Sequence, residues 1–357
     1  MTTGLRPRYA FTAGSLSADS DRPVGGPVRF VVERCLDVPV DGLRVMLAAS
    51  AGVAAGDAVT LDLGDDDGLE RVFTGSVAEL RPTLGGCSVF CTGTMLGLVE
   101  LRVAAFYQGR SAGDVVRDLI GQAGLDAGDI SDGLTLPRYA VERRQNAHAQ
   151  MRRLAQRLGF SLFADRQGKV HFRGLGPAAN LGSGGLGGAA GGVVGGAVAG
   201  AAGALGLGGG GDLAYGKHLL AAQAALRPAP SRKIVVGGES PMSGQGEDKS
   251  FWLTATDTDF EDSAGSGDEL LITDTAARTK DMAGRFAAGY AAGLAMRALA
   301  LRLTVLGLPA LDLGDELGTA DAPEAGLNTR GVITRLRHRF SAREGFVSDV
   351  VLAVQAP

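Results

Sequence analysis

The sequence is poor in aromatic residues and has no excess of positive charge. Only 5% of its 357 residues are Phe, Trp or Tyr, and Trp252 is the single tryptophan. Carbohydrate or single-stranded nucleic-acid sites built on stacked rings are therefore disfavoured. The formal net charge is −4, so the basic stripe of a nucleic-acid-binding protein and the polybasic patch of a membrane-surface protein are both missing. We expect no nucleic-acid or membrane partner.

Cysteine is also scarce. Cys35, Cys87 and Cys91 are too few, and odd in number, for a disulfide framework. Cys87 and Cys91 are four residues apart, which places both on one face of a strand. No CxxC or HxxxH pair supplies the further ligands that zinc needs. These features predict reduced thiols in the core, no metal site and no cofactor.

Signatures of catalysis are weak as well. No HExxH or phosphate-binding GxxxxGK[ST] pattern occurs. The cluster Asp65–Asp67 lacks EF-hand spacing and is interpreted as a solvated hairpin turn. His148 and His338 are interpreted as surface residues, and His171 as pointing away from the apolar side of its strand. We expect no catalytic residue, and the chain is interpreted as a non-enzyme.

Residues 1–105 have the pattern of an all-β region. Apolar residues alternate in short runs, with Gly- and Asp-rich turn signals between them. Examples are Val28/Phe30/Val32, Leu43/Val45/Leu47 and Val59/Leu61/Leu63. Short strands at this spacing predict a first antiparallel β-barrel.

Residues 106–173 predict a small α/β module. Ser111 opens a capping box ahead of a helix with one apolar face. A second helix is expected to begin near Asn146 and end at Gly159, where glycine can take the left-handed conformation of a helix stop. Residues 160–172 then have the pattern of a hairpin with a polar turn.

The segment 174–211 is rich in glycine and alanine and has no charge after Arg173. Thirty-odd uncharged residues, with Gly191 and Gly195 at small-xxx-small spacing, suit a membrane-active element. However, glycine is a poor helix former and contributes no apolar area. A flexible insert is the preferred interpretation.

The rest of the chain returns to a β pattern. Residues 212–240 are expected to supply strands that join a second barrel, including one at Lys233–Gly237. Residues 241–300 predict a connector and a long Ala-rich helix from Thr275 to Leu301, which could also belong to the α/β module. Residues 301–357 complete the second barrel. The fold class is therefore mainly β, with two similar antiparallel barrels and an α+β insertion.

One short pattern occurs in both β regions. An alternating apolar strand precedes Gly-Asp, and roughly 15–20 residues later comes Gly-x-β-x-x-Leu-Arg. The residues are Gly56, Asp57, Gly75, Val77, Leu80 and Arg81 in the first region, and Gly314, Asp315, Gly331, Ile333, Leu336 and Arg337 in the second. The repetition predicts two copies of one barrel.

A row of arginines is the candidate interface. Arg335, Arg337 and Arg339 alternate with other residues, so a strand would present all three on one face. An exposed row of this kind could contact an acidic partner surface, or could simply be a solvated strand face. Both interpretations stay open.

Several stretches, in this order along the chain, resemble one known family. They are 38–46, 56–61, 72–77, 107–116, 154–160, 165–172, 307–315, 338–341 and 345–346. The chain resembles the baseplate hub of contractile tails: the phage late control protein D family, the phage tail hub protein, and the hub portion of the type VI secretion spike protein VgrG.

The resemblance implies a structural role. Hub proteins of this kind are trimers with two similar barrels per chain, so that six barrels form a ring with pseudo-six-fold symmetry. The ring would meet a tail tube protein hexamer on one side and a three-fold spike on the other, with baseplate wedge and tape-measure proteins as further partners. No spike-like repeat follows the second β region, so we expect a separate spike protein.

The same resemblance implies a location. The segment Met1–Arg8 is not followed by an apolar run, so no signal peptide is expected. The chain would assemble in the bacterial cytoplasm and end in the baseplate of a phage tail or tail-like particle. The alternatives are a tail-tip cell-wall hydrolase and a membrane-active effector that uses residues 174–211.

Overall fold

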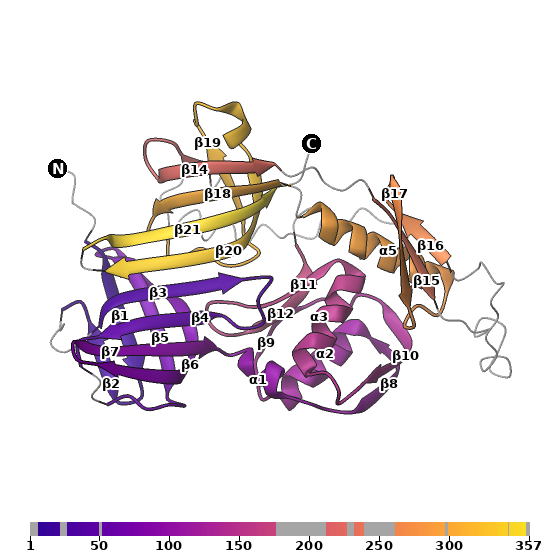
Figure 1. Cartoon of the computed structure of the whole chain (residues 1–357), viewed down its shortest axis with the longest axis horizontal. Coiled ribbons are helices and arrows are strands. Elements are labelled where there is room, and N and C mark those ends of the chain that lie inside the picture. The colour runs from indigo at the N-terminus through magenta and orange to yellow at the C-terminus, as the bar shows by residue number, and fades with distance from the viewer. Residues whose placement is uncertain are drawn as a thin grey trace.

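A computed structural model describes residues 6–21, 27–49, 52–175, 212–226, 232–238, 261–296, 299–341 and 343–354. Two curled β regions lie on one side of the molecule and an α/β module lies on the other (Figure 1). The expectations for the Gly/Ala-rich segment fall almost wholly on residues 176–211, outside the described residues.

The N-terminal β region forms the first barrel. Its strands are β1 (Arg8–Ala13), β2 (Leu16–Asp19), β3 (Pro27–Cys35), β4 (Gly42–Leu47), β5 (Ala58–Asp65), β6 (Gly68–Thr83) and β7 (Gly86–Gly93). Inward positions alternate along each strand, so Phe30, Val45 and Leu61 are fully buried in one cluster. The predicted period-2 pattern is confirmed.

The C-terminal β region forms the second barrel. Its elements are β13 (Asp212–Ala214), β14 (Leu219–Leu226), β18 (Leu299–Leu306), β19 (Glu316–Ala320), the short 3-10 turn η5 (Ala325–Leu327), β20 (Arg330–Ser341) and β21 (Gly345–Val354). Leu301, Leu303 and Val305 of β18 point into its core with Leu336 and Leu352. This core is separate from that of the first barrel.

The two barrels share one sheet because β20 pairs with β3. The strand order is β14-β18-β21-β20-β3-β4-β7-β6-β5-β1-β2, with β19 beside β20 and β13 beside β19. All neighbours in this sheet are antiparallel except β13 and β19. Each half curls around its own core as an open half-barrel (Figure 1), so the predicted mainly β fold with two similar halves is correct.

The two helices and the hairpin predicted for the first part of the α/β module are present, but its first helix lies at residues 96–100, inside the range expected for the first barrel. This part of the module contains α1 (Leu96–Glu100), β8 (Ala105–Ser111), α2 (Ala112–Gln122), β9 (Ala127–Ile130), β10 (Thr135–Val141), α3 (Ala147–Leu158), β11 (Phe160–Ala164) and β12 (Val170–Gly174). The Ser111 hydroxyl accepts a hydrogen bond from the Asp114 amide at 3.0 Å, which confirms the capping box. Asn146 caps α3, and Gly159 ends it with a φ of 68°.

The second part of the module corrects one expectation. Strands β15 (Arg232–Gly238), β16 (Glu261–Ala264) and β17 (Asp268–Asp274) form a separate sheet, which packs on helix α5 (Lys280–Ala295). Residues 212–240 were expected to join the second barrel; β13 and β14 do so, whereas β15 lies in the module. The apolar run of β15 is compatible with the sheet of the second barrel and with that of the module. Its parallel pairing with β17 places β15 in the module.

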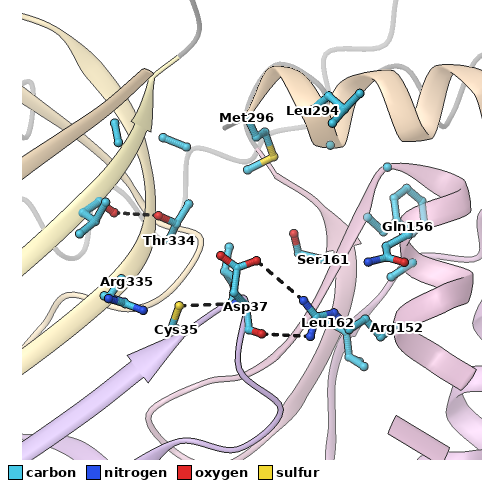
Figure 2. A pocket seen from close by; sticks show the side chains of 18 of the residues that line it. Cys35, Asp37, Arg152, Gln156, Ser161, Leu162, Leu294, Met296, Thr334 and Arg335 are labelled. Atoms are coloured by element: carbon cyan, nitrogen blue, oxygen red, sulfur yellow. Dashed lines mark hydrogen bonds and ion pairs between the residues drawn. The ribbon is translucent and has the colours of Figure 1, made fainter. Parts of the chain in front are cut away.

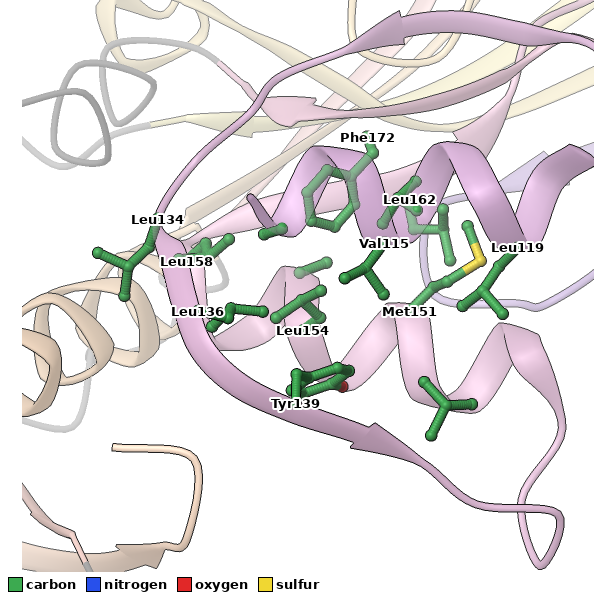
Figure 3. Packing of buried hydrophobic residues seen from close by; sticks show 14 of the residues in the cluster. Val115, Leu119, Leu134, Leu136, Tyr139, Met151, Leu154, Leu158, Leu162 and Phe172 are labelled. Atoms are coloured by element: carbon green, nitrogen blue, oxygen red, sulfur yellow. The ribbon is translucent and has the colours of Figure 1, made fainter. Parts of the chain in front are cut away.

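The Ala-rich helix is also shorter than the expected span from Thr275 to Leu301. The Thr279 side chain accepts a hydrogen bond from the Met282 amide and caps the helix there. The strand β18 begins at Leu299, where pairing with β21 replaces the helix. Both parts of the module share one core, in which Phe286 of α5 joins the cluster of α2 and α3. Figure 3 shows the α2–α3 side of that core, with Val115, Met151 and Phe172 facing one another.

The three cysteines are free and buried, as predicted. The interpretation of His148 and His338 as surface residues is wrong, since their exposed fractions are 6% and 1%. His338 has the same strand parity as Leu336 and Phe340, so the sheet turns it inward.

Candidate functional site

The Gly-Asp motif of the first barrel is a turn tied to the middle of β6. The Gly56 amide donates to the Val77 carbonyl at 2.8 Å, and the Val77 amide donates to the Asp57 carbonyl at 2.8 Å. Gly56 has a φ of 90°, a conformation that favours glycine. The Asp57 carboxylate accepts from the Ala54 amide at 2.7 Å and closes the turn.

The motif of the second barrel has the same hydrogen bonds. The Gly314 amide donates to the Ile333 carbonyl at 2.9 Å, and the Ile333 amide donates to the Asp315 carbonyl at 2.9 Å. Gly314 has a φ of 81°, and the Asp315 carboxylate accepts from the Asp312 amide at 2.8 Å. Burial raises the pKa of Asp315 to about 6. The two motifs are therefore equivalent turns.

The equivalence extends over five strands. The order β3-β4-β7-β6-β5 in the first barrel matches β14-β18-β21-β20-β19 in the second. Register irregularities also coincide: one between Pro27 and Arg29 matches one between Leu219 and Ala221. A second, after Val77 in β6, matches one after Ile333 in β20. The chain thus contains two copies of one strand pattern.

The remaining motif residues have packing roles. A Cβ at Gly75 would lie 2.1 Å from the Thr92 carbonyl oxygen, and one at Gly331 would lie 2.6 Å from that of Ala353, so both glycines let a neighbouring strand approach. Leu336 is fully buried and Leu80 partly buried. Arg81 lies over the Phe90 ring at 4.5 Å and pairs with Glu79, both on the surface.

A buried arginine joins the three parts of the molecule. Arg34 of β3 is 2% exposed and bonds to three partners, which with it make up the three-way junction: Asp41, Asp312 and the carbonyl of Ala164. The distances are 3.1 Å to Asp41, 2.7 Å to Asp312 and 2.6 Å to Ala164. Asp312 belongs to the second barrel and Ala164 to the module, so one guanidinium links both barrels and the module.

The turn of the β11–β12 hairpin lies beside this junction and contacts both barrels. The Arg166 amide donates to Asp312 at 2.9 Å, and the Arg166 guanidinium donates to the Pro309 carbonyl at 3.1 Å. On the other side, the hydroxyls of Thr74 and Thr94 donate to the carbonyls of Arg166 and Gly168 at 3.1 and 2.7 Å. The hairpin turn therefore holds the two barrels at a fixed relative position.

His338 lies close to the three-way junction. Its ring nitrogen and the Ser348 hydroxyl are 2.8 Å apart. Burial, with the nearby cations Arg34 and Arg166, lowers the pKa of His338 to about 3. The imidazole is thus neutral at physiological pH.

A groove lies between the second barrel and the module. It has a volume of about 990 Å³ and is lined by residues of α3, α5, β18 and β20. Figure 2 shows Asp37 next to Arg152, whose guanidinium donates to the Asp37 carbonyl at 3.0 Å. Met296 and Leu294 give the groove an apolar end.

The candidate arginine row lies on the outward face of β20, with Arg335 and Arg337 lining the groove. Arg337 forms an ion pair with Glu33 at 3.0 Å, and Arg339 forms one with Asp349 at 3.0 Å. These arginines are therefore engaged within the chain. A role for the row as a partner contact stays a prediction.

Comparison with solved structures relates this geometry to known proteins. The 43 kDa tail protein of prophage MuSo2 from Shewanella oneidensis matches with a TM-score of 0.66 and 15% identity, covering 97% of this chain and 98% of that one. A tail protein from Neisseria meningitidis matches with a TM-score of 0.64 and 13% identity, over 97% and 96% of the chains. This chain has the fold of phage tail proteins.

The tail-protein fold extends to secretion systems. The c3393 protein of E. coli, a type VI secretion component described as similar to tail proteins of phage T4, matches with a TM-score of 0.55 and 11% identity, over 97% of this chain and 77% of that one. No protein-family model and no curated protein matches the sequence. The resemblance to a hub family is thus supported at the level of fold.

One further pattern in the sequence is typical of an enzyme. Residues 109–113 have the Gly-x-Ser-x-Gly spacing of a hydrolase nucleophile, between strand β8 and helix α2. Ser111 has an extended backbone, with a φ of −68°, and its hydroxyl caps α2. The capping box accounts for the serine without a nucleophilic role.

Two kinds of feature are absent from the described residues. There, no group of three or more His, Cys, Asp or Glu side chains is arranged to hold a metal ion. No helix in the same part of the chain is long and apolar enough to span a membrane.

Proposed function

We propose that this chain is the structural hub of a contractile injection system or phage tail, and that it acts as a homotrimer. Three chains would supply six equivalent barrels, which adapt a six-fold tail tube to a three-fold spike. The role is mechanical: the hub holds tube and spike together until contraction drives both forward. It needs no cofactor and no catalysis.

The observation that carries the proposal is the internal duplication. Two copies of one five-strand pattern, with matching register irregularities, lie side by side in a single sheet. In a trimer that binds a six-fold ring, each subunit faces two positions of the ring. It therefore needs two similar surfaces, one for each position. A tail protein that met only three-fold partners would have no such requirement.

The three-way junction supports the mechanical role. Arg34 and the β11–β12 hairpin turn connect both barrels and the module through buried polar contacts, several of them charge-assisted. Contacts of this kind resist relative rotation of the barrels, as an adaptor under mechanical force requires.

The proposed partners are the tail tube hexamer, a three-fold spike protein, and wedge and tape-measure proteins. Assembly would take place in the bacterial cytoplasm, before the hub reaches the baseplate. The Shewanella and Neisseria matches support the tail setting through their fold.

Deletion of the gene from the producing bacterium tests the role. We expect cells without assembled particles, and restoration of particles by a plasmid copy of the wild-type gene. Electron micrographs of normal, contractile particles from the deletion strain would contradict the proposal.

A further inference from the structure

The joint between the two barrels is an antiparallel strand pair with a defined register. The end of β20 after its irregularity, residues 335–341, lies beside β3. Arg339 is opposite Val31, and Phe340 is opposite Phe30. Phe340 is 7% exposed and packs in the core of the first barrel, with its ring centroid 5.9 Å from that of Phe30.

The duplication provides a second copy of each half of this joint. In β6 the equivalent of the β20 end is Glu79–Thr83, which follows the same irregularity. In the second barrel the equivalent of β3 is β14. Following the shared registers, Thr83 corresponds to Arg339 and Gln223 to Val31.

Neither of these second halves is used within the part of the chain that the structure describes. Among the described residues, Glu79–Thr83 pairs with β7 alone, and Ala221–Leu226 of β14 pairs with β18 alone. Leu219, at the start of β14, also forms a bridge with Tyr215. The edges of β20 and β3 pair with each other at the joint, whereas the equivalent edges of β6 and β14 have no neighbouring strand among the described residues.

Equivalent residues of the two copies differ in their exposed fractions, and the residues without a neighbouring strand are the more exposed ones. Leu84, at the tip of the β6–β7 turn, is 112% exposed, although its equivalent Phe340 is buried. Ala224 of β14 is exposed, whereas its equivalent Val32 is fully buried. A fully exposed leucine on a hairpin tip loses the stabilisation that burial would provide.

From this we infer that the β6 hairpin end of one copy of the chain pairs with β14 of a second copy, in the register of the β20–β3 joint. The contact is head-to-tail, and closing it after three copies gives six similar joints around one ring. Leu84 would lie against Ala222, as Phe340 lies against Phe30. The inference rests on the trimer of the proposed function and specifies which surfaces form it.

The composition of the two edges fits a selective contact. Pro82, the equivalent of His338, has no N–H and can donate no hydrogen bond to a neighbour. Proline on an open edge discourages indiscriminate strand pairing. Small alanines at positions 221, 222, 224 and 225 of β14 leave room for a neighbouring strand. Side-chain burial, Leu84 above all, therefore contributes most to the joint.

Disulfide trapping in the full chain tests the register. Directly opposite residues in an antiparallel pair have Cα atoms within the range that a disulfide bridges, whereas residues offset by two positions do not. We expect Thr83→Cys with Gln223→Cys to give covalent dimers and trimers on a non-reducing gel after mild oxidation. The matched control, Thr83→Cys with Ala221→Cys, is expected to give less than a tenth of that yield.

The outcomes separate this inference from the proposed function. A trimeric mass with no cross-link, or with equal yields from both pairs, overturns the inference and leaves the hub intact. A monomeric mass at every concentration, unchanged by co-expression with the tube and spike proteins and with no cross-link, overturns both.

A second variant addresses the hairpin tip. Leu84→Asp changes a residue that is fully exposed in the single chain, so the melting temperature of the monomer is expected to stay unchanged. The trimer is expected to be lost. Leu271→Asp, at a 62% exposed position on β17, is expected to leave the trimer intact. A Leu84→Asp chain that kept the trimeric mass would place the contact elsewhere.

Discussion

Replacement of Arg34 by methionine perturbs the three-way junction most directly. Methionine keeps most of the apolar stem and removes the guanidinium from its contacts with Asp41, Asp312 and the Ala164 carbonyl. The Arg34 side chain is 1% exposed, and those of Asp41 and Asp312 are 12% and 15% exposed. Both carboxylates would therefore lose their main counter-charge in a poorly solvated place.

The expected loss of unfolding free energy is about 3–4 kcal/mol. Removing one partner of a buried ion pair costs about 3–5 kcal/mol, because the other charge stays buried. Asp312 still accepts hydrogen bonds from the amides of Arg166 and Leu313, which places the estimate in the lower part of this range. Asp41 loses its guanidinium partner.

Urea unfolding followed by circular dichroism measures the loss. Arg29→Met is the matched control, since Arg29 is an exposed residue of the same strand and the change is expected to cost less than about 0.5 kcal/mol. Hydrogen exchange adds a local readout: the amides of the β11–β12 hairpin turn are expected to exchange faster in Arg34→Met.

The pH dependence gives a further check. Burial already raises the pKa of Asp41 against the lowering effect of Arg34, and losing Arg34 raises it further above its unfolded value. The destabilisation is then greatest above that pKa and falls as acid protonates the carboxyl. A loss below about 1 kcal/mol at neutral pH, or one that grows on acidification, would refute the reasoning.

Two further predictions concern single residues of the second barrel. Gly331→Val would put a Cβ 2.6 Å from the Ala353 carbonyl oxygen, and it is expected to lower the free energy of unfolding by about 1–3 kcal/mol. The control Gly121→Ala has open space around the added Cβ and should not destabilise α2. Equal melting temperatures of the two variants in thermal unfolding would disprove the packing role of Gly331. His338 is neutral when folded, with a pKa lowered to about 3, so stability is lost as pH falls from its unfolded pKa of about 6.5 towards that value. The difference in stability between pH 7 and pH 4 should be about 3 kcal/mol smaller in His338→Gln, and an unchanged difference would show that His338 is not buried and neutral.

Local signals in the sequence were enough to predict the helices and hairpin of residues 111–174. Ser111 and Asn146 cap their helices, Gly159 ends the second, and the apolar period identifies the buried face. Each of these signals acts over a few residues and needs no knowledge of distant partners.

Elements whose position depends on distant pairing were predicted less well. The apolar run of β15 is compatible with either sheet, and only its parallel pairing with β17 places it in the module. Ala300 favours helix by propensity, yet pairing with β21 makes it part of β18. Tertiary contacts override local preference in both places.

The polar core of the site was missed although the sequence contains a signal for it. Arg34 has the same parity as Phe30 and Val32, so alternation places it on the apolar face of β3. The same reasoning applies to His338 beside Leu336 and Phe340. A charged or polar residue at a core position needs a buried partner. The identity of that partner, Asp312 for Arg34, follows only from the three-dimensional structure.

The sequence shows the duplication as a short repeated pattern, but it does not show which strand edges the duplication leaves unpaired. The sequence shows Gly-Asp and Gly-x-β-x-x-Leu-Arg in both halves, and the structure shows the same turn bonds in each. Which strand edges remain open depends on sheet order, which no local pattern contains.

Light scattering of the purified, full-length chain tests the central claim most directly. The account predicts a mass near three times the chain mass of 36.4 kDa, retained on dilution to the micromolar range. A strictly monomeric mass at all concentrations, unchanged when the chain is co-expressed with its tube and spike proteins, would contradict it.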